Sequence, residues 1–580
     1  MLQEDNRPIA AVENEISYHA QKLLSLRVQS NRLLPVGRLP PEILSKIFLH
    51  CRDVSDTAYF PSNSAYRWTF ITHVCHYWRE VGLSTPHLWS VIHLGCISRS
   101  FAEALVLRSK AAPLYLDADP GNRPYMDGLL QITTPLLHRA RTIRFELKDK
   151  LYEAFPSEFS AEASELQELS LRPDCSQTTR GYVPPPLPIF LTRCNAPQLK
   201  VLEVSLYTIP WNLVRLPSTL ARLTIINPSR QSTVSEVVAA VLGLTALQYL
   251  FFEDIFASAP FAAEVDGSVQ YPKVTTRLTL AHMTEIWMAG SAIECIHFLD
   301  HLVLPHPATV DFEALHPITN VPASAVPSIL APLASFLPLG LGSNSDCGAD
   351  TLQLDPLYII LKREAPLSSD RADPDFKAFL DVGIGGDEEA VVLLSGLCSQ
   401  RRLVGITKLV IIGQDIRLDL NVSWMVIFES LPDLKTISFV AFQEPHEIGL
   451  PGFIKTVVDH DELLPNLRAL LFESVHFLPH ERLSHPGTTR EPVHATPEKE
   501  ENSNSLISDM CCTFGAHPGR IEVVVLINCS YVKKVDIANL EKVVPHVKWE
   551  QRSTSRSQDT HWHVSPYNES DLNADLGNPK

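Results

Sequence analysis

Apolar residues near the N-terminus repeat every three or four positions, the spacing of one face of a helix. Residues 12–34 contain no Gly or Pro, and they place Ile16, Leu23, Leu26 and Leu33/Leu34 near multiples of a helical turn. The pattern therefore predicts a helix over 12–34 that ends before Pro35.

A second helix is predicted in LPPEILSKIFLHC, residues 39–51. Pro40 and Pro41 suit its first turn, because the backbone N–H groups there are unpaired in any helix. The next apolar residues fall on one face; they are Ile43, Leu44, Ile47 and Phe48. Such a stripe requires a cover.

The stretch WTFITHVCHYWREVGLSTPHLWSVIHL, which begins at Trp68, predicts a further amphipathic helix. Its apolar positions recur at three or four residues; they are Trp68, Ile71, Val74/Cys75, Trp78 and Val81. A unit of about 55 residues buries little surface by itself. We therefore expect these helices to pack against either the rest of the chain or another protein.

Beyond residue 130 the chain repeats a short phrase, apolar-x-x-apolar-x-apolar. The last three positions of the phrase alternate between apolar and variable residues, which predicts a strand with two inward side chains. The first apolar residue anchors the turn that leads into the strand. Helical returns are predicted in TVSEVVAAVLGL, DEEAVVLLSGLCSQRRL and VSWMVIFESLP. Successive starts from 140 to 299 lie 21 to 33 residues apart, and the phrase occurs at 140–145, 166–171, 199–204, 220–225, 247–252, 275–280, 299–304, 406–411, 434–439, 467–472 and 521–526.

Stacking such units gives a parallel-strand solenoid with a concave strand surface, and a non-repeating α/β domain is the alternative. Residues 305–400 depart most from the pattern, with a proline-rich run and GIGGDEE, although TLQLDPLYIILKRE is predicted as strand. We expect an irregular insertion or a degenerate repeat there. Residues 484–505 and 551–580 have the polar composition of disordered segments.

The charge balance narrows the range of partners. The chain of 580 residues holds 49 Lys+Arg against 66 Asp+Glu, a net charge of -17, which disfavours broad binding to nucleic acid or to an anionic membrane. Val321 to Gly342 carries no charge and is long enough to span a bilayer, but its four prolines favour a buried, broken-helix connection. We expect no membrane partner.

The N-terminus lacks the basic start and apolar core of a secretory signal, which predicts a cytoplasmic or nuclear protein. The eleven cysteines are then expected as reduced thiols, without a disulfide framework or a zinc finger.

No motif predicts an enzyme, a metal site or a cofactor. The nearest resemblance to a catalytic motif is HERLSH, His480 to His485, in which the second His comes one residue too late for both imidazoles to share a helix face. GIGGDEE lacks the Gly-Lys-Ser/Thr ending that cradles a phosphate.

The N-terminal residues carry a family resemblance. LPPEILSKIF, followed after an insertion by VCHYWREVGLSTPHLW, resembles the F-box. That resemblance implies a small all-helical unit that docks on the Skp-type adaptor of Skp-cullin-F-box ubiquitin ligases, and through it on a cullin. His76, where the family more often has Arg or Lys, and the long loop from Arg52 to Arg67 depart from the pattern. The matching, adaptor-binding positions are Leu39, Pro40, Glu42, Ile43, Leu44, Ile47, Phe48, Val74, Cys75, Trp78, Arg79, Leu83, Pro86, Leu88 and Trp89.

The repeated phrase resembles leucine-rich repeats. Together the two resemblances imply an α+β or α/β solenoid protein, with an N-terminal all-helical F-box followed by a leucine-rich-repeat-like array of parallel strands and helices. The expected domains are a helix at 12–34, an F-box-like domain at 35–95, a repeat array at 96–550 with the insertion at 305–400 and a loop at 484–505, and a tail at 551–580.

The function implied is that of a non-catalytic substrate receptor, which holds a protein target on the concave strand face for ubiquitin transfer by other subunits. A repeat scaffold acting outside ubiquitination is the alternative, and a hydrolase or transferase with its site in 305–400 is a third. Neither the target nor any modification it carries follows from the residues. The expected target contacts are Glu203, Arg222, Tyr249, Phe251, Arg277, His301, Lys408 and Glu473.

Overall fold

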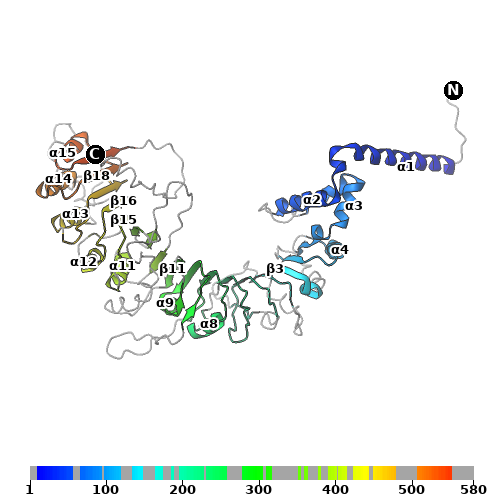
Figure 1. Ribbon diagram of the computed structural model, residues 1–580, viewed down its shortest axis with the longest axis horizontal. Coiled ribbons are helices and arrows are strands. Elements are labelled where there is room, and N and C mark those ends of the chain that lie inside the picture. Colours follow the sequence, from blue (N-terminus) through cyan, green and yellow to red (C-terminus); the bar gives the residue numbers. More distant parts are fainter. Residues whose placement is uncertain are drawn as a thin grey trace, which may run out of the picture. The chain divides into compact units, whose positions relative to one another are not determined.

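The chain has an α/β fold with a large, mostly parallel sheet (Figure 1). The computed structural model describes residues 9–56, 66–94, 97–118, 134–147, 163–173, 184–187, 195–226, 230–257, 277–304, 308–316, 350–354, 358–362, 376–380, 389–400, 403–413, 418, 422–442, 449–460, 462–477 and 506–551. Contacts divide it into two compact units, Met1–Ser229 and Arg230–Lys580, and each is described by itself.

The first unit begins with helices and continues as a parallel sheet. Its helices are α1 (Ile9–Leu33), η1 (Pro35–Arg38), α2 (Pro41–Asp56), η2 (Arg67–His73), α3 (His76–Ser84), η3 (Pro86–Trp89), α4 (Arg99–Ser109) and η5 (Thr134–Arg139), where η marks a short 3-10 helix. Its strands are β1 (Val91–His93), β2 (Leu114–Ala118), β3 (Ala140–Leu147), β4 (Glu168–Pro173), β5 (Val201–Ser205) and β6 (Arg222–Ile226). Each strand pairs in parallel with the next one along the chain.

The second unit also combines helices with a mostly parallel sheet, and its described helices are interspersed among the strands. These helices are α8 (Val234–Val241), α9 (Ala292–Asp300), α11 (Glu389–Gln400), α12 (Val422–Glu429), α13 (Leu450–Asp459), α14 (Leu506–Ala516) and α15 (Lys534–Leu540). The strands are β7 (Tyr249–Glu253), β8 (Leu278–Thr279), β9 (Glu285–Ser291), β10 (Leu302–Val303), β11 (Thr309–His316), β12 (Thr351–Leu354), β13 (Tyr358–Lys362), β14 (Phe376–Leu380), β15 (Lys408–Ile412), β16 (Thr436–Val440), β17 (Ala469–Glu473), β18 (Val523–Ile527) and β19 (His546–Glu550).

Strand order in the second unit is regular at both ends and reversed in the middle. β7, β9 and β11 pair in parallel, as do β15 to β19. Between them the order is β11, β14, β13, β12, β15, and β13 runs antiparallel to both neighbours. This reversal lies within 305–400, the region where the repeated phrase is absent.

The phrase marks the strands because its first residue is a core anchor. In eight of the phrases the strand begins two residues after that anchor. The anchors of these eight phrases are all buried: Leu166, Leu199, Leu220, Leu247, Ile406, Leu434, Leu467 and Ile521. The two later apolar residues of the phrase lie on the same face of the strand and are buried with the anchor. Each repeat of the phrase therefore adds one layer to the core.

The carboxyl ends of several strands share a second feature, a residue with left-handed backbone. Its N–H donates to a backbone carbonyl of the neighbouring strand. The acceptor is the last strand residue for Leu206 to Ile226 and Ala441 to Glu473, and Ala289 within β9 for Asp254. Gly413, Ser474 and Asn528 repeat the arrangement after β15, β17 and β18. Left-handed backbone is costly for residues other than Gly, so its recurrence reflects one local geometry imposed by the packing.

One prediction about an individual element is wrong. The apolar run from Trp68 forms η2 and α3 rather than one helix, because Cys75 has extended backbone between them (φ -157°). The phrases at 275–280 and 299–304 contain strands as predicted, β8 and β10, but these two short strands do not join the large sheet and pair only with each other within the described part of the chain.

Several sequence expectations fall on residues outside the described ranges: the uncharged run Val321 to Gly342, the HERLSH motif, the segment 484–505 and nearly all of 551–580. Among the residues that are described, no helix is both long and apolar enough to cross a bilayer.

Candidate protein-docking surfaces

The N-terminal helices form a small core of their own. Leu44 and Phe48 of α2 are completely buried, and so is Leu88 of η3. Trp89 is also buried; its indole N–H donates to the carbonyl of Gly82 at 2.8 Å, and its ring meets that of Trp68 edge-on with centroids 5.1 Å apart. These contacts join α2, η2, α3 and η3.

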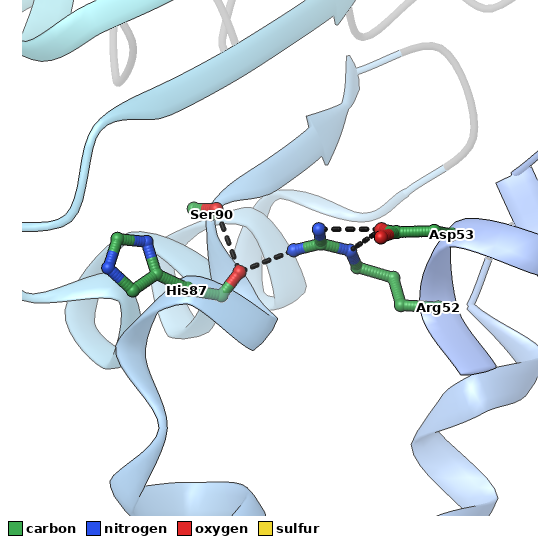
Figure 2. Close-up of polar contacts among 4 residues, drawn as sticks. All are labelled: Arg52, Asp53, His87 and Ser90. Atoms are coloured by element: carbon green, nitrogen blue, oxygen red, sulfur yellow. Dashed lines mark hydrogen bonds and ion pairs between the residues drawn. The ribbon is translucent and has the colours of Figure 1, made fainter. Parts of the chain in front are cut away.

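A partly buried arginine connects α2 to η3, the short helix that carries Trp89 (Figure 2). The Arg52 guanidinium donates to Asp53 Oδ1 at 2.7 and 3.0 Å and to the carbonyl oxygen of His87. The Ser90 hydroxyl donates to the same carbonyl at 2.8 Å. Since the Arg52 side chain is only 12% exposed, the Asp53 carboxylate compensates a charge that burial would otherwise make costly.

The same helices leave other apolar side chains uncovered. Ile43 and Ile47 lie one turn apart on α2 and are 45% and 41% exposed, while Val74, which precedes α3, is 60% exposed. Phe70 of η2 is exposed as well. Because α2 packs directly on η2 and α3, these residues belong to one small helical assembly.

The structure therefore sorts the fifteen residues predicted to bind the adaptor. Buried are Leu44, Phe48, Leu88 and Trp89; partly buried are Leu39, Cys75, Trp78, Leu83 and Pro86; exposed are Pro40, Glu42, Ile43, Ile47, Val74 and Arg79. Only the last two groups offer surface to a partner.

On the sheet of the first unit, one face carries a ladder of paired acidic and basic side chains. His93 Nδ1 lies 2.9 Å from Asp117 Oδ2, Arg144 binds Glu168 at 2.5 Å, and the next pair, Arg172 with Glu203, is 3.2 Å apart. We call these six residues the charge ladder. The hydrogen bond to Glu168 raises the pKa of Arg144, as do the charges of Asp117 and Glu203.

On β7 and β9 of the second unit, alternate side chains are buried in the core. The side chains between them lie on the other, partly exposed face of the sheet, and some of these are aromatic. Phe251 of β7 and Trp287 of β9 are register partners, and their rings stack with centroids 4.0 Å apart and planes within 8°. Next to them Glu253 and Glu313 are only partly buried. Burial raises the pKa of Glu253, and the nearby charges of Asp254 and Glu313 raise it further.

The eight predicted target contacts are distributed over both units and over several strands of the second. All are at least partly exposed. Glu203 and Arg222 lie on the first unit's sheet, and Tyr249 and Phe251 on β7. Lys408 begins β15, Glu473 ends β17, and Arg277 and His301 lie beside the separate β8–β10 pair. Arg277 is 4.0 Å from Asp300, and the His301 ring lies 5.2 Å from that of His297.

The sequence analysis did not identify several residues that contact the predicted sites. Arg144 is exposed and Glu168 partly buried, and both alternate with core residues inside recognised phrases, so strand alternation finds this pair. It does not find His93, Asp117 and Arg172, which lie outside the phrases. Trp287 lies in MTEIWM, residues 283–288, which fits the phrase with Met at both ends. Arg52 offered no comparable signal, because its partner is a backbone carbonyl 35 residues away.

Four of the described thiols have little nucleophilic character. Burial raises the pKa of Cys398 to about 12, and that of Cys529 to about 11. Burial likewise raises the pKa of Cys511 to about 11, and that of Cys295 further still. Such thiols stay protonated at neutral pH. Within the described ranges, no three His, Cys, Asp or Glu side chains gather closely enough to hold a metal ion.

Comparison with known proteins adds no family to these observations: no protein-family model matches the chain, and no curated protein does either.

Proposed function

We propose that this chain is the substrate-recognition subunit of a Skp-cullin-F-box ubiquitin ligase. Its N-terminal helices would bind the Skp-type adaptor, and the strand faces would bind a protein target. Catalysis would belong to other subunits, and this chain would act by proximity. It would work where the adaptor and the cullin reside, in the cytoplasm or the nucleus.

The observation that carries the proposal is the division of the F-box-like residues into two sets. Leu44, Phe48, Leu88 and Trp89 already form a core, so Ile43, Ile47 and Val74 are not needed to close it. Exposed apolar side chains grouped on a small helical assembly are typical of a protein interface.

We further propose that the repeat part is a leucine-rich-repeat-like solenoid. Three observations support it: the buried anchor two residues before many strands, the parallel pairing of consecutive strands, and the left-handed residue at strand ends. A solenoid exposes one long strand face, which suits the recognition of a large partner.

Co-purification with a Skp-type adaptor and a cullin tests the adaptor role. The informative variant is Ile43→Asp/Ile47→Asp, because both residues are exposed and their substitution leaves the core intact. Leu107→Asp is the matched control, since Leu107 is 79% exposed on α4 of the same unit. Substituting the buried Leu44 would test folding instead of docking.

The proposal predicts that the wild type and Leu107→Asp retain both partners and that the double variant loses them while keeping its circular dichroism spectrum. Absence of adaptor binding by the wild type would refute the F-box assignment. Adaptor binding without a cullin would favour the alternative of a repeat scaffold outside ubiquitination.

A further inference from the structure

Helix α1 is long and has no buried residue. Its 25 residues extend about 37 Å. Apolar side chains are nevertheless frequent: Ile16 is 62% exposed, Leu23 51% and Leu33 69%. A helix this apolar gains little from folding alone in water, because most helical stability in proteins comes from packing an apolar face.

The exposed apolar residues follow a heptad rather than a simple helical period. Counting from Ile9 in steps of three and four reaches Val12, Ile16, His19, Leu23, Leu26, Ser30 and Leu33. We call these eight residues the seam; six of them are apolar. A spacing of 3.5 residues keeps a seam facing a second helix over several turns, which is the requirement of a coiled coil.

We propose that α1 pairs with α1 of a second copy of this chain as an antiparallel two-stranded coiled coil. Such a dimer is isologous, since the same seam serves both copies. In an antiparallel pair each first-position residue of the heptad faces a fourth-position residue of the other helix. The layers are then Ile9 with Leu33, Val12 with Ser30, Ile16 with Leu26, and His19 with Leu23, each occurring twice.

This arrangement favours the antiparallel orientation in two ways. Every polar seam residue faces an apolar one, whereas a parallel pair would place His19 against His19 and Ser30 against Ser30. The flanking positions also agree, because Glu13 of one helix approaches Arg27 of the other, again twice. A parallel pair would instead bring Lys22 next to Arg27. The antiparallel pair retains one unfavourable contact between like charges, because Lys22 of one helix approaches Lys22 of the other.

Substitutions in α1 test the pairing without unfolding the chain, since α1 has no buried residue. Sedimentation velocity of the full chain, without any adaptor, follows the mass from 64.7 kDa toward twice that value between about 1 and 100 µM. Leu23→Asp places a charge in the seam. Leu24→Asp is the matched control, because Leu24 is equally apolar and 60% exposed but lies outside the seam.

We expect Leu23→Asp to weaken the dimer about 100-fold and Leu24→Asp by less than about threefold. Arg27→Glu should weaken it, and Glu13→Arg added to that variant should restore it. A monomeric wild type over the whole concentration range, or equal loss in the two Leu variants, would overturn the proposal. Because no adaptor is present, these outcomes are independent of the proposed ligase function.

Disulfide cross-linking tests the orientation. In the antiparallel dimer Val12→Cys and Ser30→Cys chains cross-link when mixed, and neither links to itself above the wild-type background. Self-linking of Val12→Cys chains would show a parallel pair and overturn the assigned orientation.

Discussion

Both units are built mainly from parallel strands, but they carry different side chains on the sheet face that lies opposite the anchors of the phrase. In the first unit that face carries the charge ladder, whose acids and bases pair across neighbouring strands. In the second unit it begins with the Phe251–Trp287 stack and becomes apolar at β17 and β18, where Leu471 and Val525 are buried. Parallel strand pairing is thus compatible with either charged or apolar side chains on this face, because the backbone hydrogen bonds do not depend on the side chains.

The difference bears on recognition. Charges that already satisfy one another have less to gain from a partner, and surface ion pairs contribute little energy. Partly exposed aromatic rings provide a large contact area at small entropic cost and dominate many interfaces. Within the proposed receptor function, the aromatic strands of the second unit are therefore the stronger candidate for the target contact.

The largest expected effect on stability comes from placing a charged side chain on the apolar sheet face of the second unit. Val525 is the third residue of β18 and 2% exposed, so Val525→Asp buries an unpaired charge and should cost more than about 3 kcal/mol of unfolding free energy. Ser170 holds the third position of β4 between Arg144 and Glu203, to which its hydroxyl donates at 3.2 Å. In Ser170→Asp the attraction to Arg144 offsets the repulsion by Glu203, so stability should change by less than about 1 kcal/mol. Urea unfolding followed by circular dichroism measures both; similar losses would contradict the comparison.

The next effect concerns the aromatic stack. Trp287→Ala and Phe251→Ala should each lower stability by about 2 kcal/mol, because each removes contact area and the stacking of the rings. Since both lose the same stack, the double variant should cost about 1 kcal/mol less than the sum. A double-mutant cycle by thermal unfolding gives this coupling, and strict additivity would show that the rings do not interact.

A smaller effect is expected in the charge ladder. Arg144→Met removes the pair with Glu168, in which the arginine is exposed and the glutamate partly buried, so the loss should be about 0.5 to 1 kcal/mol at low ionic strength. The difference from wild type should nearly vanish in 1 M salt, where charges are screened beyond about 3 Å. A loss that persists in 1 M salt would mean that Arg144 acts through its packing.

Much of this architecture follows from the sequence. A strand overlaps each of the eleven phrases, because the burial of alternate side chains requires apolar residues at alternate positions of the sequence. The phrase does not show which strands become neighbours, so the reversal at β12 to β14 and the separate β8–β10 pair were not predicted. Likewise the F-box-like pattern mixes core and surface residues, and only packing separates Leu44 from Ile43.

The smallest effect is a dependence on pH that has opposite signs at two glutamates. Burial, Asp254 and Glu313 raise the pKa of Glu253, so its ionised form weakens the folded state. Its favourable contribution is complete below the unfolded value of about 4.3 and is lost as the pH rises through the raised value. Glu253→Gln should therefore be more stable than wild type at pH 7, by less than about 1 kcal/mol after solvent screening, and equal to it near pH 4.

Glu236 provides the matched control with the opposite sign. The backbone N–H and hydroxyl of Thr233 hydrogen-bond its carboxylate and lower its pKa, so its contribution is present at neutral pH and lost in acid. Glu236→Gln should then be less stable than wild type at pH 7, and the gap should narrow on acidification. Melting temperatures at pH 4 and pH 7 measure both variants. If Glu253→Gln also destabilised at pH 7, the carboxylates beside the aromatic stack would be compensated after all, and the contrast with the charge ladder would fail.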